Sequence, residues 1–322
     1  MFFLGVDAGG SKAAFALCDS SGTVKARYRC KSQGAFSLGM SGIEKLVAEG
    51  AEEVCKAAGI SVGDIAWAGL GFPGYGEQEN NESEIDAACA RALPGVPVTC
   101  ACDCWLGWAG SLAMGPGVNI VSGTGSICFG ANARGQTARS GGWGEYCDEG
   151  SCSWIGRRLI AEFTKQSDGR KPKTPLYSMF REALGITNDI YFIYRLNRDF
   201  AGKPDETARL QVLAEKAARA GDPVSRRIYG EAAEELCIAI TAVADRLGLN
   251  NGSGFLVSYS GGLFKAGDCI LTPLAERVTK AGGRLTAPLR EPEIGAVFMA
   301  LRAYDPKADI FDFCQNIKEE YS

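Results

Sequence analysis

The chain of 322 residues contains no histidine. This absence excludes histidine as a general base, zinc sites with histidine ligands, and hydrolases that use a Ser-His-Asp triad. Acid–base chemistry therefore falls to carboxylates, lysine, tyrosine or cysteine. The sequence also lacks any run approaching the roughly 20 apolar residues of a membrane span. It has no GxxxxGK[ST] motif, which excludes a P-loop.

Strong charge of one sign is also missing. The formal net charge is −4, so neither nucleic acid nor an anionic membrane is favoured as a partner. The N-terminal MFFLGVDAGG lacks the basic region of a signal peptide and leads directly into a predicted strand. We therefore expect a cytoplasmic protein that has no nucleic-acid or membrane partner.

Cysteine, in contrast, is abundant, with 13 residues. A chain of this length forms a core without disulfides, so we expect reduced thiols in the cytosol. Cys100, Cys102 and Cys104 alternate along a predicted strand, which would place three thiols on one face. We interpret them as packing thiols, and ligation of a metal or an iron–sulfur cluster is the alternative.

Three glycine-rich turns each follow a predicted β-strand: Gly9-Gly10, Gly123-Thr124-Gly125 and Gly261-Gly262. Without a Cβ, glycine lets backbone N–H groups approach an anion closely. An ordinary hairpin needs glycine too, so one such turn alone is ambiguous. Together they predict that two hairpins hold the phosphates of a nucleotide and that the third turn borders its adenine.

The predicted order of elements begins again after residue 117. Each half opens with a strand, a glycine turn, a second strand and a third strand, and helices and strands then alternate. This pattern predicts an α/β fold of two similar domains with mixed sheets, residues 1–117 and 118–322, that face a cleft. Residues 166–204 are predicted to be irregular. Whether the tail from about Pro306 packs back on the first domain stays open.

Asp103 follows the predicted strand 98–102 and precedes a helix rich in small residues. Phosphoryl transfer to a hydroxyl needs an acceptor for the hydroxyl proton, and kinases use an aspartate for it. In a chain without histidine, Asp103 is the candidate base. The alternative is that Asp103 only caps the following helix.

A second glycine cluster, Gly141-Gly142-Trp143-Gly144, precedes Asp148-Glu149. Backbone amides and carboxylates can bind several hydroxyls at once, so this segment predicts a polyhydroxylated substrate. The alternative for the two acids is a helix N-terminus, whose dipole favours negative charge. Trp143 is either a packing residue or a stacking platform.

These motifs together resemble the BadF/BadG/BcrA/BcrD-type ATPase family, which includes N-acetylglucosamine kinase and belongs to the actin-like ATPase superfamily of sugar kinases, Hsp70 and actin. The resemblance covers nearly the whole chain. The segments that carry it occur in the family's order: GVDAGGSKAAFALCDSSG, VSGTGSICFG, SGGWGEYCDEGSCSWIG, DGRKPKTPL, SGGLFKAG and PEIGAVFMA.

The resemblance implies two actin-like (ribonuclease H-like) domains, with mixed β-sheets flanked by helices and the active site in the interdomain cleft. It implies ATP and Mg²⁺ as cofactors, with Asp103 as catalytic base and Asp7 holding Mg²⁺ through water. Phosphate contacts are implied for Gly9, Gly10, Ser11, Lys12, Gly123, Thr124 and Gly125. Adenosine contacts are implied for Gly261 and Gly262, and sugar contacts for Ser37, Gly141, Gly142, Trp143, Gly144, Asp148 and Glu149.

The implied activity is phosphorylation of the 6-hydroxyl of N-acetylglucosamine, with N-acetylmuramic acid and glucosamine as close alternatives. We also expect a homodimer. Two departures from the family lie on the substrate side. Only three residues separate GGWG from DEGS, one fewer than in the family, and Ser37 stands where an asparagine is expected.

Two other classes of protein compete with a kinase. One is an ATPase that activates a 2-hydroxyacyl-CoA dehydratase-type enzyme through an iron–sulfur cluster, but the cysteine–glycine signature of such activators, resembling NDKCAAGTG, is not found. The other is a non-catalytic sensor of sugar and ATP, although no DNA-binding segment is apparent at either end of the sequence.

Overall fold

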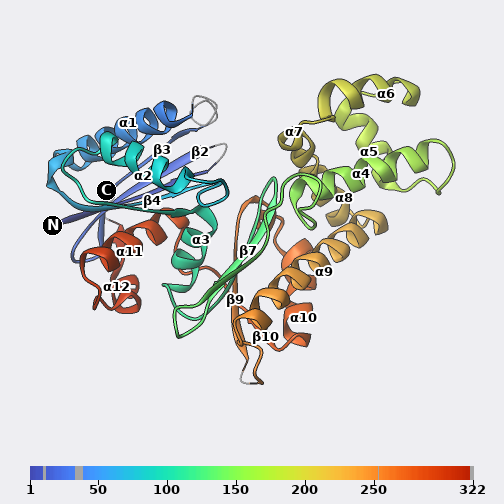
Figure 1. The fold of residues 1–322 in the computed structure, drawn as a ribbon. Helices are drawn as coiled ribbons and strands as arrows, with labels where there is room; N and C mark the ends of the chain where they lie inside the picture. Colours follow the sequence, from blue (N-terminus) through green and yellow to red (C-terminus); the bar gives the residue numbers. More distant parts are fainter. Residues whose placement is uncertain (10–11, 33–38, 253, 320–322) are drawn as a thin grey trace. The chain divides into compact units, whose positions relative to one another are not determined.

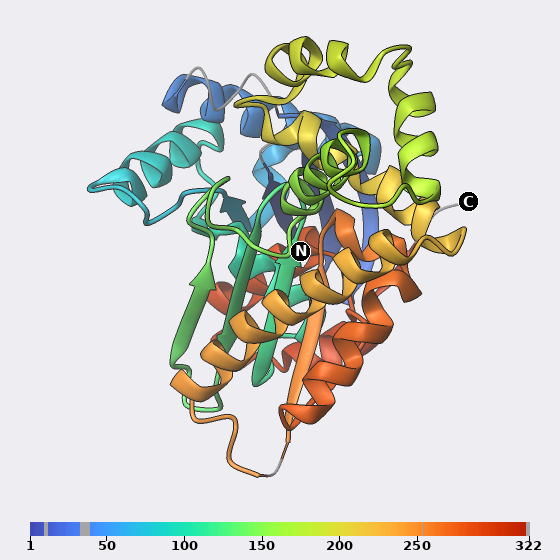
Figure 2. The ribbon, with the colours of Figure 1, turned by 90° about the vertical axis from the view of Figure 1, so that its right-hand side faces the viewer.

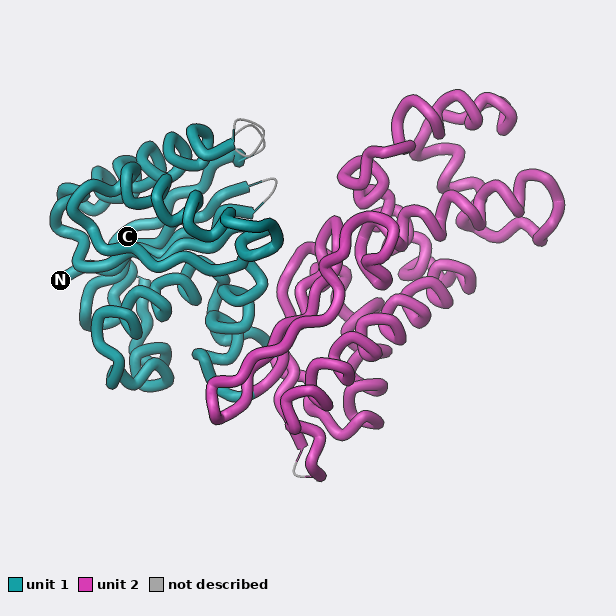
Figure 3. Tube along the Cα trace, viewed as in Figure 1, with its two compact units in different colours: residues 1–116, 287–322 teal, residues 117–286 magenta. Residues whose placement is uncertain are grey.

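The structure is a computed structural model that describes residues 1–9, 12–32, 39–252 and 254–319. The chain divides into two compact units (Figure 3). Unit 1 contains residues 1–116 and 287–322, and unit 2 contains residues 117–286. The first boundary lies next to the one predicted at residue 117. The predicted second domain, 118–322, is too long at its C-terminal end, because residues 287–322 belong to unit 1.

Unit 1 is built on a six-stranded mixed sheet of order β11-β3-β2-β1-β4-β5. β1, β2 and β3 are antiparallel neighbours, whereas β1, β4 and β5 run parallel. The carboxyl ends of these three parallel strands therefore meet at one edge of the sheet. The strands are β1 (Phe2–Ala8), β2 (Lys12–Asp19), β3 (Thr23–Lys31), β4 (Ile65–Phe72), β5 (Val98–Cys102) and β11 (Lys318–Glu319).

Helices cover both faces of this sheet (Figure 1). Side chains alternate along β1, so that Leu4 packs in the cluster under α1 and α2, whereas Phe3 packs in the cluster with α11 and α12. Both side chains are buried, which fixes the register of the strand. The helices are α1 (Met40–Ala58), α2 (Asn81–Ala92), α3 (Asp103–Leu112), α11 (Pro292–Tyr304) and α12 (Ile310–Asn316).

Helix α11 joins unit 1 because glycines let it approach the backbone of the sheet. A Cβ added at Gly5 of β1 would lie 2.1 Å from the carbonyl oxygen of Glu293. One added at Gly69 of β4 would lie equally close to the carbonyl oxygen of Ala296, 2.1 Å away. Gly295 meets α3 in the same way, since a Cβ there would lie 2.2 Å from the carbonyl oxygen of Leu106. Helix α11 thereby positions α3 as well as closing the sheet.

Unit 2 repeats the strand arrangement of unit 1. Its five-stranded sheet has the order β10-β9-β6-β7-β8, with antiparallel β6, β7 and β8 and with β9 and β10 added in parallel to β6. The prediction of two similar α/β halves is therefore confirmed at the level of topology. The strands are β6 (Gly117–Ser122), β7 (Ser126–Ala131), β8 (Thr137–Gly141), β9 (Phe255–Ser260) and β10 (Gly283–Leu285).

Helix α9 crosses one face of this second sheet and contacts β6, β7 and β8 (Figure 2). The rest of the unit is largely helical, and no helix among the described residues is long and apolar enough to cross a membrane. The helices are α4 (Cys152–Ser167), α5 (Pro175–Leu184), α6 (Phe192–Arg195), α7 (Pro204–Arg209), α8 (Gln211–Arg219), α9 (Pro223–Arg246) and α10 (Asp268–Lys280).

The prediction that residues 166–204 are irregular is wrong, because α5 and α6 lie within them. Helix α5 begins with Pro175 at its first turn and ends at Gly185 in the left-handed conformation, both of which are ordinary helix boundaries. Aromatic packing holds the segment in place. The rings of Phe163 and Phe180 stack with centroids 4.3 Å apart, and Phe192 meets Phe163 edge-on.

Candidate active site

The parallel strands of unit 1 bring Asp7 and Asp103 to one edge of the sheet. Asp7 lies near the end of β1 and pairs in register with Gly71 of β4, which in turn pairs with Ala101 of β5. Asp103 is the first residue of α3, directly after β5. A Cβ at Gly71 would lie 3.5 Å from the Cα of Asp103 and 2.1 Å from a methyl of Leu106. The lack of a side chain at Gly71 therefore lets the start of α3 approach this edge.

Two carboxylates lie near each other at this edge of the sheet, and the positive charge around them does not balance their negative charge. The pKa of Asp7 is raised to about 7, first by burial and then by the negative charges of Asp103 and Glu293, while the charge of Lys12 acts in the opposite direction. A half-buried carboxylate in this state gains from a nearby cation. The residues therefore fit a hydrated Mg²⁺ held by Asp7.

Asp103 is not the N-cap residue of α3, contrary to the alternative interpretation that it only caps this helix. Cys102 is the N-cap residue of α3 and makes no side-chain cap hydrogen bond. The carboxylate of Asp103 accepts a hydrogen bond from the backbone N–H of Cys104 at 2.8 Å. This bond orients the carboxylate at the helix N-terminus.

The first predicted phosphate turn is described only in part. Gly10, Ser11 and the predicted sugar residue Ser37 lie outside the described residues. The carbonyl oxygen of Gly9 accepts a hydrogen bond from the hydroxyl of Ser32. Lys12 is exposed at the start of β2, and its charge acts on Asp7. Within unit 1 the structure therefore brings Lys12 and Asp103 together around Asp7.

The second predicted phosphate turn joins β6 to β7 in unit 2. The N–H of Gly123 donates to the carbonyl oxygen of Gly125 at 2.9 Å, and the carbonyl oxygen of Gly123 accepts from the N–H of Cys152 at the start of α4, also at 2.9 Å. The hydroxyl of Thr124 donates to Asp205 at 2.7 Å. A Cβ at Gly123 would meet no atom within 4 Å, whereas one at Gly125 would lie 2.5 Å from Oδ2 of Asp148. Gly123 thus leaves open space that a ligand can enter.

Asp148 connects this turn to the predicted sugar segment. Its side chain is buried, with 5% exposure. Oδ1 accepts hydrogen bonds from the N–H groups of Trp143 at 2.8 Å and Gly144 at 3.2 Å, and Oδ2 accepts one from the N–H of Ser126 at 3.4 Å. Asp148 therefore fixes the two loops relative to each other. Sequence reasoning missed this role, because its partners come from two separate segments.

The remaining residues of the predicted sugar segment are accessible. Gly141, Gly142 and Gly144 have positive φ, which explains the glycines in this loop. Glu149 is exposed, and the Trp143 side chain is 79% exposed, so the packing interpretation of Trp143 is wrong. Both side chains line a pocket of about 220 Å³ with Ser126, Ser140, Gly141, Glu235 and several apolar residues.

The third glycine turn follows β9 and contacts the second. Gly261 has a φ of 103°, and a Cβ there would lie 2.3 Å from the carbonyl oxygen of Ser122, directly before the phosphate turn. A Cβ at Gly262 would meet no atom within 4 Å. Gly261 is therefore required for the approach of two backbone segments, and Gly262 borders open space.

The alternating thiols do not share one face. Cys100 and Cys102 belong to β5, but Cys104 belongs to α3, because the strand ends at Cys102. None of the 13 cysteines, all of them in the described part of the chain, forms a disulfide. In that same part of the chain, no group of three or more His, Cys, Asp or Glu side chains is arranged to hold a metal ion.

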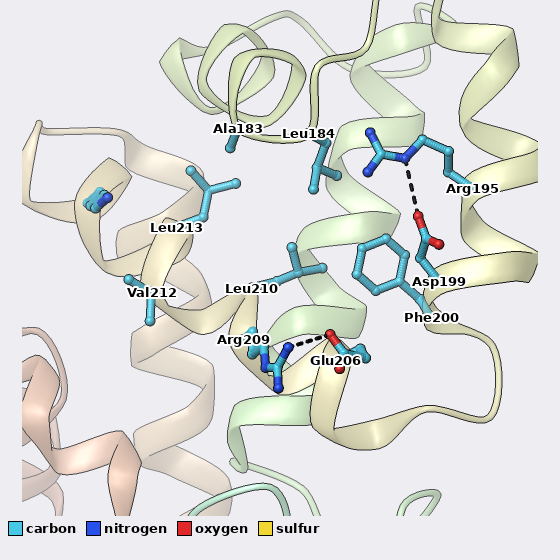
Figure 4. Close-up of a pocket in the computed structure, with 11 residues that line it drawn as sticks. Ala183, Leu184, Arg195, Asp199, Phe200, Glu206, Arg209, Leu210, Val212 and Leu213 are labelled. Carbon is cyan, nitrogen blue, oxygen red and sulfur yellow. Dashed lines mark hydrogen bonds and ion pairs between the residues drawn. The ribbon is translucent and has the colours of Figure 1, made fainter.

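A further pocket of about 400 Å³ lies among the helices of unit 2 (Figure 4). Leu184, Phe200 and Leu210 contribute apolar surface. Its charged side chains are paired in part, as Arg195 lies 3.2 Å from Asp199 and Arg209 lies 2.8 Å from Glu206. None of the predicted site residues that the structure describes lines this pocket, so it is not part of the candidate active site.

Comparison with known proteins identifies relatives over nearly the whole chain. The sequence model of the BadF/BadG/BcrA/BcrD ATPase family matches residues 4–300. The chain is 27% identical to an N-acetyl-D-glucosamine kinase of Dictyostelium discoideum, over 94% of this chain and 98% of the relative. It is 37% identical to an N-acetylmuramic acid/N-acetylglucosamine kinase of Clostridium acetobutylicum, over 49% of this chain and 52% of that protein.

A solved structure is also similar over nearly the whole chain. The crystal structure of a candidate N-acetylglucosamine kinase from Chromobacterium violaceum superimposes with a TM-score of 0.73 at 25% identity. The match covers 92% of this chain and 98% of that one. The predicted two-sheet, actin-like fold class is therefore confirmed.

Proposed function

Because the chain belongs to the BadF/BadG/BcrA/BcrD ATPase family, we propose that it is an ATP-dependent amino-sugar kinase. The reaction is transfer of the γ-phosphate of ATP to the 6-hydroxyl of N-acetylglucosamine or of a close relative such as N-acetylmuramic acid or glucosamine. The observation that carries this proposal is the position of Asp103 beside Asp7 at the carboxyl edge of the unit 1 sheet.

In this proposal Asp103 accepts the proton of the attacking hydroxyl. A general base of this kind contributes about 10²–10⁴ in rate. Its bond from the N–H of Cys104 holds the carboxylate in place. Asp7 would hold Mg²⁺ through water, and the bound ion would neutralise negative charge on the phosphates.

The glycine turns support a nucleotide as the donor. Open space at Gly123 and Gly262 leaves room for phosphate and for adenosine at the backbone. Lys12 at the start of β2 supplies positive charge near Asp7. Gly9 and Thr124 complete the proposed phosphate contacts, together with Gly10 and Ser11, which lie outside the described residues.

The loop from Gly141 to Glu149 supports a sugar acceptor. Glu149 is accessible to hydroxyls, and the exposed ring of Trp143 offers an apolar face of the kind that stacks on a sugar ring. The names of the Dictyostelium and Clostridium relatives favour an amino sugar. A cytoplasmic location and a homodimer stay predictions.

The proposal is tested by a coupled assay of ADP release with N-acetylglucosamine, glucosamine, N-acetylmuramic acid, N-acetylmannosamine and glucose as separate acceptors. Analysis of the product by NMR then locates the phosphate on the sugar. We expect turnover with at least one amino sugar and phosphate on its 6-oxygen. If none of the acceptors raises ADP release above the rate with ATP alone, the kinase assignment is wrong.

A further inference from the structure

Two thiols flank the proposed base. Cys102 is the last residue of β5, and Cys104 is the second residue of α3, so that Asp103 lies between them. Their sulfur atoms are 2.9 Å apart, well inside van der Waals contact. Since Asp103 has helical backbone, the Cα atoms of its two neighbours also lie within the range over which disulfides form.

The two thiols differ in exposure. Cys102 is half-buried, whereas Cys104 is buried, with 1% exposure. A small oxidant therefore reaches Cys102 first, and Cys104 is placed directly behind it. Both residues are at the N-terminus of a ten-residue helix, whose dipole favours a thiolate, whereas the carboxylate of Asp103 between them opposes it.

We propose that Cys102 and Cys104 form a reversible oxidation site at which a hydroperoxide joins them in a disulfide around Asp103. The Cys102 thiolate attacks the O–O bond of the peroxide and becomes a sulfenic acid. The other half of the peroxide leaves as hydroxide or, after protonation, as an alcohol. The Cys104 thiol then attacks this sulfur, so that an S–S bond forms and water leaves. Two thiols are oxidised, one peroxide is reduced, and a dithiol reverses the step by exchange.

The disulfide would move the carboxylate of Asp103. The sulfur atoms must approach to about 2.05 Å and adopt a Cβ–S–S–Cβ dihedral near 90°. The ring that closes contains only three residues, and Asp103 is the middle one, so its backbone and the first turn of α3 must adjust. A displacement of about 1 Å at a reacting group can lower a rate about 10²-fold. Such a short-ring disulfide is strained and readily reduced.

The expected loss of kinase activity rests on the proposed function, whereas formation of the Cys102–Cys104 disulfide does not. The test therefore uses two separate measurements on the full-length protein after treatment with hydrogen peroxide and again after dithiothreitol. Kinase activity is one measurement. The other is mass spectrometry of alkylated peptides, with fragmentation that separates Cys100, Cys102 and Cys104.

Matched variants assign the effect to the pair. Cys102→Ser and Cys104→Ser each remove one partner. Cys100→Ser is the control on the same strand, where the thiol is hydrogen-bonded with that of Cys89. Cys269→Ser is the control for a partly exposed thiol elsewhere, in α10 of unit 2. Thermal melting of each variant verifies that it folds. Mass spectrometry locates the disulfide in the wild-type protein itself, so this measurement does not depend on any variant.

We expect a Cys102–Cys104 disulfide and at least a tenfold loss of activity that dithiothreitol restores. Both control variants should behave like the wild type. In Cys104→Ser, dimedone should trap a sulfenic acid at Cys102. The proposal is overturned if oxidised wild-type protein retains both thiols, or if activity falls equally in Cys102→Ser. A disulfide in a protein that phosphorylates no sugar would leave this site standing and reject the kinase function.

Discussion

The carboxyl groups of Asp7 and Asp103 interact across the edge of the unit 1 sheet. After burial, the charge of Asp103 is the largest contribution that raises the pKa of Asp7 to about 7. The two acids come from β1 and from the start of α3, which the sheet brings together through Gly71. This proximity is the basis for assigning one of them to a cation and the other to a proton.

Replacing Asp103 with Asn should abolish phosphoryl transfer. The amide keeps the shape of the side chain but cannot accept the hydroxyl proton, so we expect kcat to fall about 10²–10⁴-fold. Nucleotide affinity, measured by calorimetry, should stay nearly unchanged. Asp64→Asn, a change to an acid that is hydrogen-bonded to Ser61, is the matched control and should retain full activity. Wild-type turnover in Asp103→Asn would remove Asp103 from the role of base.

Replacing Asp7 with Asn should stabilise the unliganded protein at alkaline pH. The pKa of Asp7 is about 7 when folded, against an ordinary value of 3.8, so the folded state holds the proton more tightly. The stability contributed by this group is therefore greatest below pH 4, declines as the pH rises to about 7, and is constant above that. Neutral Asn does not undergo this loss.

Differential scanning fluorimetry of both proteins between pH 5 and pH 8 measures this difference. The gain from Asp7→Asn should be smaller at pH 5 than at pH 7 and level off above pH 7. Its upper limit is about 4 kcal/mol, at about 1.4 kcal/mol for each pKa unit, and partial exposure of the side chain lowers it. The same variant should lose Mg²⁺-dependent turnover. A constant difference in melting temperature across this range would contradict the prediction.

Asp148→Ala should destabilise the fold, whereas Glu149→Gln should not. The first change removes the acceptor of three backbone N–H groups, and we expect the free energy of unfolding to fall by about 2–4 kcal/mol. The second alters an exposed side chain, so only the KM for the sugar should rise. Urea unfolding and steady-state kinetics separate the two effects. Equal stability of Asp148→Ala and wild type would show that Asp148 does not hold the loops.

Gly123→Ala and Gly125→Ala should have different effects on ATP binding and on stability. The new methyl at Gly123 meets open space, so the fold should be retained while KM for ATP rises at least tenfold. At Gly125 the methyl would lie 2.5 Å from the Asp148 carboxylate, so this variant should also melt at a lower temperature. Thermal melting with and without ATP distinguishes them. Unchanged ATP kinetics in Gly123→Ala would exclude close approach of phosphate there.

Trp143→Ala should affect sugar binding without affecting stability. Its side chain is 79% exposed, so little apolar packing is lost with it. If the ring stacks on the sugar, KM for the sugar should rise while KM for ATP and the melting temperature stay constant. Trp108→Ala, at a tryptophan that is 5% exposed in unit 1, is the contrasting variant and should lower the melting temperature. Wild-type sugar kinetics in Trp143→Ala would exclude stacking.

Features that depend on neighbouring residues could be predicted from the sequence. Gly9 follows β1, the other two glycine turns follow β6 and β9, and the repeated strand order appears in both sheets. Each follows from an apolar strand of definite length that ends in a turn signal. The sequence also contains boundary signals for α5, a proline at its start (Pro175) and a glycine at its end (Gly185). The prediction that residues 166–204 are irregular did not take them into account.

Features that depend on distant residues could not be predicted. The clamp formed by Asp148 is visible only when the N–H groups of Trp143 and Ser126 are seen to point at one carboxylate. The assignment of α11 to unit 1 depends on glycines of β1 and β4 that lie more than 200 residues earlier in the chain. Nothing in the local pattern of either segment identifies its partner.

The place of α11 in unit 1 has a consequence for the order in which the protein matures on the ribosome. Unit 2 is one continuous segment and is fully available once residue 286 has emerged. The strands of unit 1 are made first, but Gly5 and Gly69 receive their covering helix only when the last part of the chain appears. Because domains generally fold as units during synthesis, the N-terminal sheet is the later of the two to be completed. Until then, apolar side chains that pack against α11, such as Phe3, stay uncovered.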